Sequence, residues 1–371
     1  MKIAFVVHDY AREFGHGRYV VELAERFSKE HEVHVFANTY SNTGNPCIEF
    51  HRVPALRRNA LSSILTFLVP ASRVRRSRFD IVHSQGLCCF SFDVTTAHMC
   101  NRAWFRARLE SGEPVTWRER VFELVVSPLE HFHYRRSTRA WVIAVSNRIR
   151  EDLRRCYGRQ ERVSVIYHGV DLDRFSPAQR HRYRTEMRRE CGVGDSDVLC
   201  LFVGNLSKGA TPTLRALAAV PHAKLVFVTR SAVEAYRRIA GTIGVLDRVS
   251  FRPPTNQIEK YYAAGDAFVF PTPYESYGMV ISEAMASGLP VITSRAAGAA
   301  ELIEHGRDGF LLNNPSDNSE IAAYLERLSV DGALRNRLGQ AARAVIEEYS
   351  WDRVAAQTMD LYRRILAERR L

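Results

Sequence analysis

The sequence lacks any apolar run long enough to cross a membrane. Its longest mostly apolar segment, Leu61 to Ala71, is about half the length of a membrane-spanning helix. No secretory signal is evident, because the run from Ile3 to Val7 is short and ends at His8-Asp9, which is typical of a first strand. We therefore expect a protein that is soluble or peripheral to a membrane.

The sequence also lacks the cysteine spacings that are typical of zinc sites. The seven cysteines contain no C-x-x-C spacing, and Cys88 and Cys89 are adjacent within an apolar run. This pattern argues against a zinc site or a disulfide framework and favours a reduced, cytoplasmic setting. We expect the cysteines to serve in packing.

Negative charge is missing from one long segment. The chain carries a net charge of +11, with 27 basic and 19 acidic residues up to Pro177 and 25 against 22 after it. Residues 52–78 contain seven arginines and no acid around an apolar centre, and residues 102–108 combine three arginines with two aromatic residues. Such segments are typical of surfaces that meet anionic lipids. The alternative is a solvated basic face whose apolar residues lie in the core.

Nucleic-acid binding is the other function that a basic chain suggests. The sequence shows no zinc-finger spacing, no RNP-type aromatic run and no basic helix followed by heptads. We therefore expect no nucleic-acid partner.

Short apolar runs alternate with helical stretches along the whole chain, and nearly continuous apolar content indicates parallel strands covered on both faces. A length of 371 residues suggests two or three domains. The polar stretch from Asp173 to Asp197 separates two series of strands and predicts a boundary near Pro177. The predicted strands are 2–8, 32–37, 48–53, 80–84, 94–98, 140–146 and 163–167, then 198–203, 224–229, 248–251, 267–270 and 290–293.

The segment from Pro273 to Ile292 carries the clearest chemical signal. It predicts a loop that turns into a helix at Gly278 and stops at Gly288. The free amides at the start of such a helix, around Gly278, Met279 and Val280, favour an anion. Two carboxylates, Glu275 and Glu283, bracket this helix start and can accept hydrogen bonds from sugar or ribose hydroxyls.

This segment resembles the E-x7-E signature of the retaining nucleotide-sugar glycosyltransferases of family 4. The resemblance continues through nearly the whole chain in the expected order. Its other parts are Gly15 to Tyr19, Val163 to Asp171, Phe175 to Pro177, Gly298 to Ile303 and Gly306 to Phe310.

The resemblance implies an α/β protein with the GT-B fold, in which two doubly wound, Rossmann-like domains with parallel sheets face each other across a cleft. Residues 1–177 would bind the acceptor, residues 178–350 would bind the nucleotide sugar, and a last helix near 351–371 would pack back on the first domain. The motif loops at Gly15, His98, Gly204 and Glu275 each follow a predicted strand, where ligands of such sheets bind.

The resemblance also assigns roles to residues of the second domain. Glu275 would contact sugar hydroxyls, Glu283 the ribose, and Lys208 the diphosphate. The companion arginine of the family is absent, and Asn205 stands near its place. Arg18, Arg230 and Arg295 are the alternative sources of positive charge, and Gly204 belongs to the same donor loop.

In the first domain, His98 resembles the histidine that stabilises positive charge on the transferred sugar. Gly15 and Gly17 would let the backbone closely approach a phosphate of the donor or the acceptor, although a tight turn explains them equally well. Arg18 and Tyr19 would lie on the acceptor side.

A divalent metal is not expected in the reaction. Two D-x-D strings occur, at residues 171–173 and 195–197, but neither lies where a parallel sheet would hold phosphate. We expect no cofactor. The donor is a substrate, and we expect a UDP-sugar in preference to a GDP-sugar.

The predicted function is a retaining hexosyltransferase, peripheral at the inner face of the membrane, that acts on an envelope glycolipid such as lipopolysaccharide or on a lipid-linked glycan. The alternatives are transfer to a small soluble acceptor and a catalytically weak protein that binds nucleotide sugars. The missing arginine motivates the last of these.

Overall fold

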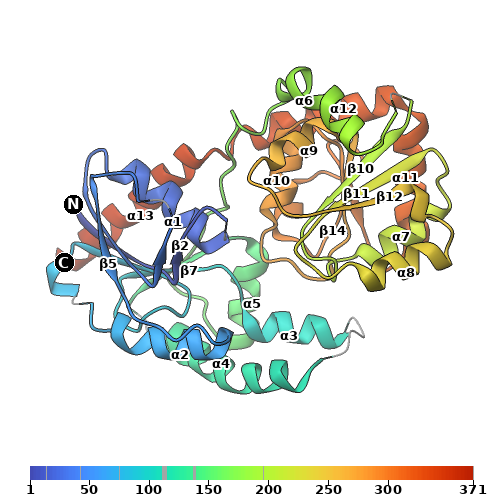
Figure 1. The fold of residues 1–371 in the computed structure, drawn as a ribbon. Helices are drawn as coiled ribbons and strands as arrows, with labels where there is room; N and C mark the ends of the chain where they lie inside the picture. Colours follow the sequence, from blue (N-terminus) through green and yellow to red (C-terminus); the bar gives the residue numbers. More distant parts are fainter. Residues whose placement is uncertain are drawn as a thin grey trace. The chain divides into compact units, whose positions relative to one another are not determined.

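A computed structural model describes residues 1–13, 15–41, 43–74, 76–110, 115–136, 139–194 and 196–370, with Arg136 described by its backbone alone. The chain divides into two compact units (Figure 1). Unit 1 contains Met1–His168 and Trp351–Leu371, and unit 2 contains Gly169–Ser350.

Unit 1 is built on a seven-stranded parallel sheet with the order β5-β3-β1-β6-β7-β8-β9. Its strands are β1 (Lys2–Val6), β3 (Glu32–Ala37), β5 (Ile48–Arg52), β6 (Ile81–Gln85), β7 (Val94–Ala97), β8 (Trp141–Ala144) and β9 (Val163–Val165), and the short pair β2 (Asp9–Tyr10) and β4 (Thr39–Tyr40) lies apart. The helices are α1 (Gly15–Phe27), α2 (Ala60–Ala71), α3 (Asn101–Glu110), α4 (Trp117–Arg136), α5 (Asn147–Tyr157) and α13 (Trp351–Arg370), with a 3-10 turn η1 (Arg76–Arg78).

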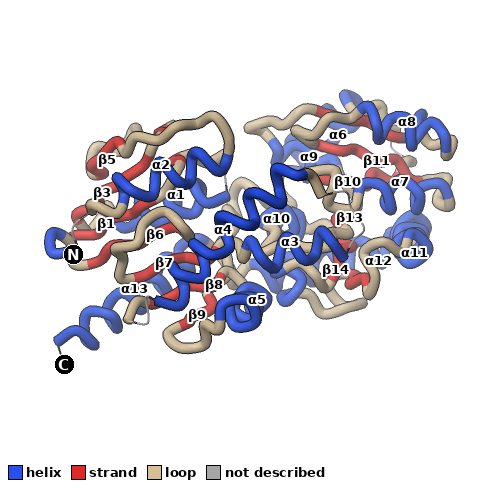
Figure 2. The backbone as a smooth tube through the Cα atoms, turned by 90° about the horizontal axis from the view of Figure 1, so that it is seen from below, coloured by secondary structure: helices blue, strands red, loops and turns tan. Residues whose placement is uncertain are grey.

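Helices flank the strands of each unit (Figure 2). In unit 1, α13 packs along α1, so the end of the chain completes the core around the first strands. The Tyr362 hydroxyl lies 2.6 Å from His83 Nδ1, and the Tyr362 ring packs edge-on against Phe27. On the α2 side, Phe67 and Ala71 pack in one apolar cluster with Ala4 and Val82.

Unit 2 has a six-stranded parallel sheet with the order β12-β11-β10-β13-β14-β15. Its strands are β10 (Val198–Val203), β11 (Ala223–Val228), β12 (Val249–Arg252), β13 (Ala267–Phe270), β14 (Val291–Ser294) and β15 (Phe310–Leu312). The helices are α6 (Gln179–Glu190), α7 (Ala210–Ala218), α8 (Glu234–Thr242), α9 (Ile258–Ala264), α10 (Met279–Ala286), α11 (Asn318–Val330) and α12 (Gly332–Ile346), with 3-10 turns η2 (Leu246–Arg248) and η3 (Gly298–Leu302).

The two parallel, doubly wound sheets confirm the predicted α/β fold class. Two short strand pairings were not predicted. β2 and β4 are only two residues long, and β15 is a three-residue edge strand that gives little periodic signal.

The predicted boundary at Pro177 differs from the structural division between His168 and Gly169. Residues after His168 are anchored in unit 2, because the buried Phe175 ring packs edge-on against Tyr262 and Arg343 Nη1 donates to the Phe175 carbonyl at 2.9 Å. Because Phe175 packs in unit 2, the boundary between the units lies before it, at His168–Gly169, and not at Pro177, where the composition changes.

The polar stretch from Asp173 to Asp197, which separates the two series of strands, contains helix α6, and this helix belongs to unit 2. Arg184 and Arg188 reach from α6 to the buried carboxylate of Asp266 at 2.5 and 2.8 Å, and Asp266 also accepts from the Leu199 amide. A buried carboxylate needs such partners. Arg184 and Arg188 therefore hold α6 against the rest of unit 2 and are not merely solvent-exposed charges.

Candidate functional site

Each sheet has a point where the chain changes direction, and ligands of parallel sheets bind beyond the strand ends at such points. In unit 2 the chain runs outward from β10 through β11 to β12 and then returns to β13 on the other side of β10. In unit 1 it runs outward from β1 to β5 and returns to β6. The loops that follow β10 and β13, and those that follow β1 and β6, therefore define the two candidate sites.

Lys208 and Glu275 meet at the switch point of unit 2. Lys208 lies in the loop after β10, Glu275 lies in the loop after β13, and their side chains form an ion pair. The backbone of Glu275 is fixed by bonds from its amide to the Ala296 carbonyl and from the Gly298 amide to its own carbonyl, at 3.1 and 3.0 Å. The structure thus joins two residues to which the family resemblance assigns separate roles.

The two loops approach each other too closely for side chains at certain positions. Gly209 has φ +106°, and a Cβ atom there would lie 2.4 Å from the Pro271 carbonyl oxygen. Gly204 has φ +137°, and its Cβ would lie 3.3 Å from the Phe270 ring. The loop between β10 and α7 is therefore held against the β13 loop, which brings Lys208 within reach of Glu275.

Helix α10 begins beside this pair. Its N-cap, Gly278, has φ +94° and supplies no side-chain hydrogen bond to the helix. A Cβ on Gly278 would lie 3.1 Å from Glu275 Cγ, so glycine allows the helix start to approach the carboxylate. Met279 and Val280 form the first turn, where helix amides lack intrahelical partners and favour an anion.

Glu283 lies in the second turn of α10 and is only 4% exposed. The Tyr262 hydroxyl lies 3.0 Å from its Oε2. A buried carboxylate held by a tyrosine is pre-positioned to accept hydrogen bonds. Sequence reasoning missed Tyr262, because nothing in the spacing of α9 relates it to a residue of α10.

Asn205, which stands near the place of the family arginine, serves the loop itself. Its Oδ1 accepts from the Ser207 amide at 2.9 Å and from the Ser231 hydroxyl at 3.2 Å. Asn205 therefore ties the loop after β10 to the loop after β11, where the exposed Arg230 lies. Arg295 is also exposed and follows β14 in the same sheet.

In unit 1, buried histidines gather near the ends of β6 and β7. His98 Nε2 lies 2.8 Å from the Gln85 amide oxygen, and His98 Nδ1 has no hydrogen-bond partner among the described residues. The His16 ring stacks on His98 with centroids 4.3 Å apart. Burial holds the pKa of His98 well below its usual range. His98 is therefore a neutral imidazole whose Nδ1 can accept a hydrogen bond.

Tyr19 lies among these histidines and is fully buried. Its ring packs edge-on against His98, with centroids 5.1 Å apart, and lies 5.3 Å from His168, whose pKa burial lowers to about 3. The Tyr19 ring therefore packs against the histidines of this cluster, and its assignment to the acceptor side stays a prediction.

The glycines of α1 allow a close backbone approach. A Cβ on Gly17 would lie 2.4 Å from the Ala11 carbonyl oxygen, so the loop after β1 packs directly on the helix. Gly15 is the first residue of α1. Arg18 is partly exposed, and its Nε donates to the Arg12 carbonyl at 3.1 Å.

The D-x-D strings contain carboxylates with structural contacts. Asp171 Oδ1 accepts from the Arg174 amide at 3.0 Å, and Asp197 pairs with Lys224 at 2.8 Å. Asp195 lies outside the described residues. Neither Asp171 nor Asp197 lies beside Lys208 in the contacts that the structure describes.

Two family models match the chain. "Glycosyltransferase Family 4" matches residues 15–174, and "Glycosyl transferases group 1" matches residues 197–331. An uncharacterised glycosyltransferase of Methanocaldococcus jannaschii is 32% identical over 60% of this chain and 59% of its own length. A D-inositol 3-phosphate glycosyltransferase of Streptomyces bingchenggensis is 33% identical over 60% of this chain and 52% of its own length. In these alignments the chain thus spans little more than half of each relative.

Solved structures match nearly the whole chain. WaaG, described as a glycosyltransferase involved in lipopolysaccharide biosynthesis, covers 97% of this chain and 99% of its own, with a TM-score of 0.82 and 20% identity. Anabaena HepE, solved with UDP and glucose, covers 97% of this chain and 98% of its own, with a TM-score of 0.75 and 19% identity. These structures share the fold, and the matched models cover most of the sequence. The chain therefore belongs to the family 4 glycosyltransferases and has their GT-B fold.

Proposed function

We propose that this chain is a retaining, metal-independent hexosyltransferase that transfers a sugar from a nucleotide donor to a glycolipid or lipid-linked glycan of the cell envelope. The observation that carries the transfer reaction is the Lys208–Glu275 pair at the switch point of unit 2, beside the start of α10. Positive charge, helix amides and a carboxylate converge there, as a leaving diphosphate and a sugar require.

In this proposal the Lys208 ammonium and the first amides of α10 stabilise the diphosphate as the glycosidic bond breaks. Phosphate binding to Lys208 would release Glu275 to accept hydrogen bonds from sugar hydroxyls. The buried Glu283 would accept from the ribose. The leaving phosphate would take the acceptor proton, so no carboxylate nucleophile is required. His98, neutral because it is buried, would contribute a hydrogen-bond acceptor or a carbonyl near the sugar.

A uridine nucleotide is the proposed donor base. HepE, which shares the fold, has been solved with UDP and with UDP-glucose. We expect one nucleoside diphosphate to stabilise the protein without metal, by roughly 2.7 kcal/mol when present at 100 times its dissociation constant. Thermal denaturation against a panel of nucleoside diphosphates and nucleotide sugars, in the presence of a chelator, measures this effect.

The matched variants are Glu283→Ala and Glu234→Ala. Glu283 is buried at the site, whereas Glu234 is exposed at the start of α8. We expect the nucleotide shift to disappear in the first variant and persist in the second. A shift that requires manganese would contradict metal independence, and a shift unchanged in Glu283→Ala would contradict the assigned ribose contact.

The membrane part of the proposal depends on helices α2 and α4, which pack side by side through Leu68 and Val126 (Figure 1). Large apolar side chains remain exposed on both helices, and exposed arginines flank α2 at Arg58 and Arg73. The exposed apolar residues are Leu65, Val69, Trp117, Val121, Leu124 and Phe132. Such a surface suits insertion among anionic lipid head groups.

The structure changes the predicted extent of this surface. Residues 102–108 lie in α3, where Arg108 pairs with Glu119 at 3.1 Å and stacks on Trp104, so part of their charge is compensated. Arg75 lies outside the described residues. The apolar side chains of α4 were not predicted, because this helix carries acidic residues among them. Within the described ranges, no helix is both long and apolar enough to cross a membrane.

We expect the protein to bind vesicles that contain anionic lipid more tightly than neutral vesicles. Removing two arginines in Arg58→Gln/Arg73→Gln should weaken this binding by about 30-fold, since each basic residue near the surface contributes about 1 kcal/mol. The control pair, Arg189→Gln/Arg238→Gln, changes two exposed arginines of unit 2. Co-sedimentation at two salt concentrations measures both, and equal binding to neutral and anionic vesicles would contradict a lipid surface.

Transfer to a small soluble acceptor is the second candidate. It is favoured by the name of the Streptomyces relative, which acts on D-inositol 3-phosphate. Transfer that needs no lipid-linked acceptor, together with no vesicle binding, would favour this candidate.

A further inference from the structure

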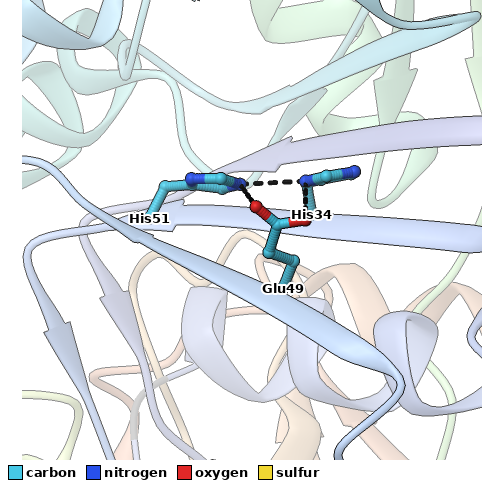
Figure 3. A group of neighbouring side chains, drawn as sticks. All are labelled: His34, Glu49 and His51. Atoms are coloured by element: carbon cyan, nitrogen blue, oxygen red, sulfur yellow. Dashed lines mark hydrogen bonds and ion pairs between the residues drawn. The ribbon is translucent and has the colours of Figure 1, made fainter.

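A cluster of two histidines and a glutamate lies on unit 1, apart from both switch points. In the β3–β5 register His34 is directly opposite Glu49, and Phe36 is opposite His51. Side chains two residues apart on a strand share a face, so all four project from the same side of the sheet. Figure 3 shows the imidazoles of His34 and His51 meeting over the Glu49 carboxylate.

The polar atoms of the cluster converge closely. His34 Nδ1 lies 2.9 Å from His51 Nε2 and 3.3 Å from Glu49 Oε2, while His51 Nε2 lies 3.2 Å from Glu49 Oε1. Four tetrahedral ligands at zinc distances are separated from each other by about 3.3 Å. The spacing of the three groups therefore matches the ligand spacing of such an ion. Among the described residues this is the one group of three that meets metal-binding geometry.

A second carboxylate orients the buried histidine. Glu32 Oε1 lies 3.0 Å from His34 Nε2, and Lys2 Nζ pairs with Glu32 at 2.7 Å. Because Glu32 accepts the Nε2 proton of His34, the Nδ1 lone pair points to His51 and Glu49. Metal-ligating histidines are commonly held by a carboxylate in this way. Without metal, His51 Nε2–H lies between two acceptors, His34 Nδ1 at 2.9 Å and Glu49 Oε1 at 3.2 Å.

We propose that His34 Nδ1, His51 Nε2 and Glu49 bind a divalent transition metal of the zinc class, with water as the fourth ligand. Two imidazoles and one carboxylate suit zinc, nickel or copper, whereas magnesium and calcium prefer oxygen ligands. The ion would replace the proton shared by the two imidazoles.

The surroundings give this site a structural role. The His51 ring stacks on Phe36 with centroids 4.4 Å apart, and Phe79 meets His34 edge-on at 5.1 Å. β5 is the edge strand of the sheet and pairs only with β3 among the described strands. A metal ion joining the two strands would hold this edge in register. The site takes no part in the proposed sugar transfer, so either proposal can fail without the other.

The test is thermal denaturation and isothermal titration of the full, metal-stripped chain with zinc, cobalt and magnesium. Zinc at 100 times its dissociation constant should stabilise the protein by roughly 2.7 kcal/mol, and an excess of chelator should reverse the shift. Magnesium should have no effect. Cobalt should produce the visible absorption of a tetrahedral site.

The variants His51→Gln and Glu49→Gln change the two more exposed ligands of the metal site, so we expect the sheet to stay intact in both. Each should lower zinc affinity at least tenfold, whereas His181→Gln and His222→Gln, which change exposed histidines elsewhere, should leave it unchanged. The proposal is overturned if zinc gives no reversible shift, or if His51→Gln and His222→Gln bind it equally well.

Discussion

Replacing Lys208 by methionine is expected to lower kcat by about 10²–10³-fold, because loss of one positive group aimed at developing negative charge costs this much in related electrostatic sites. Lys208 is the basic side chain that the structure places against Glu275 at the end of β10. The variant also leaves the Glu275 carboxylate uncompensated beside the phosphates, which adds repulsion. Release of nucleoside diphosphate from the donor that stabilises the protein measures the effect.

The double variant Lys208→Met/Glu275→Gln tests whether the two residues act as a unit. Residues in direct contact give non-additive effects, so we expect the double variant to be no slower than Lys208→Met alone. Glu275→Gln by itself should lower kcat while nucleotide affinity is retained. Lys29→Met, an exposed lysine of unit 1, is the control. A Lys208→Met protein with full turnover would refute the assigned role and leave Arg230 or Arg295 as the cation to test.

Acidification from pH 6 to pH 5 is expected to lower the free energy of unfolding by on the order of 4 kcal/mol. Burial lowers the pKa of four histidines whose side chains are buried, with His83, His133 and His168 at about 3 and His98 well below its usual range. The pKa of His8 and that of His16 are lowered in the same direction, to about 4. These groups stay neutral in the folded chain but bind protons when it unfolds below pH 6.5. Their contribution is complete above that pH and is lost as the pH falls toward 3.

The ionisation of Glu130 changes the free energy of unfolding with pH in the opposite direction. Burial raises its pKa to about 7, although Asn101 and Tyr157 hydrogen-bond to it. It holds a proton in the folded state that the unfolded chain releases above pH 4.5, so its contribution falls as pH rises from about 4.5 to 7. One group of this kind offsets about one histidine, so Glu130 and the four buried histidines together give a net uptake of about three protons on unfolding and the slope above. His8 and His16 act in the same direction as the other histidines.

Denaturant unfolding at fixed temperature and several pH values measures the slope. His133→Gln should reduce it by about 1.4 kcal/mol per pH unit, and Glu130→Gln should make it steeper by about the same amount. These variants therefore change the slope in opposite directions. A stability that is flat between pH 6 and 5 would show that the buried histidines are protonated in the folded protein.

Much of the fold follows from local sequence. Each of the twelve predicted strands corresponds to one in the structure, because buried parallel strands are nearly continuous apolar runs. The start of α10 at Met279 also follows from local signals, since Gly278 precedes it and Gly288-Leu289-Pro290 ends it. The helix α6 itself was not predicted within the polar stretch, because its amphipathic signal is weak and it is held to unit 2 by ion pairs with Asp266.

The order of strands and helices, the glycines at sharp turns and the carboxylates beside a helix start could all be predicted from local sequence, because they depend on neighbouring residues. Contacts between distant side chains could not, because they depend on the tertiary structure. Lys208 and Glu275 are 67 residues apart and pair because β10 and β13 are neighbours in the sheet. The His34–His51 contact likewise depends on the β3–β5 register, and the burial of Tyr19 depends on packing. Strand order and register arise from packing over the whole unit, which no local pattern encodes.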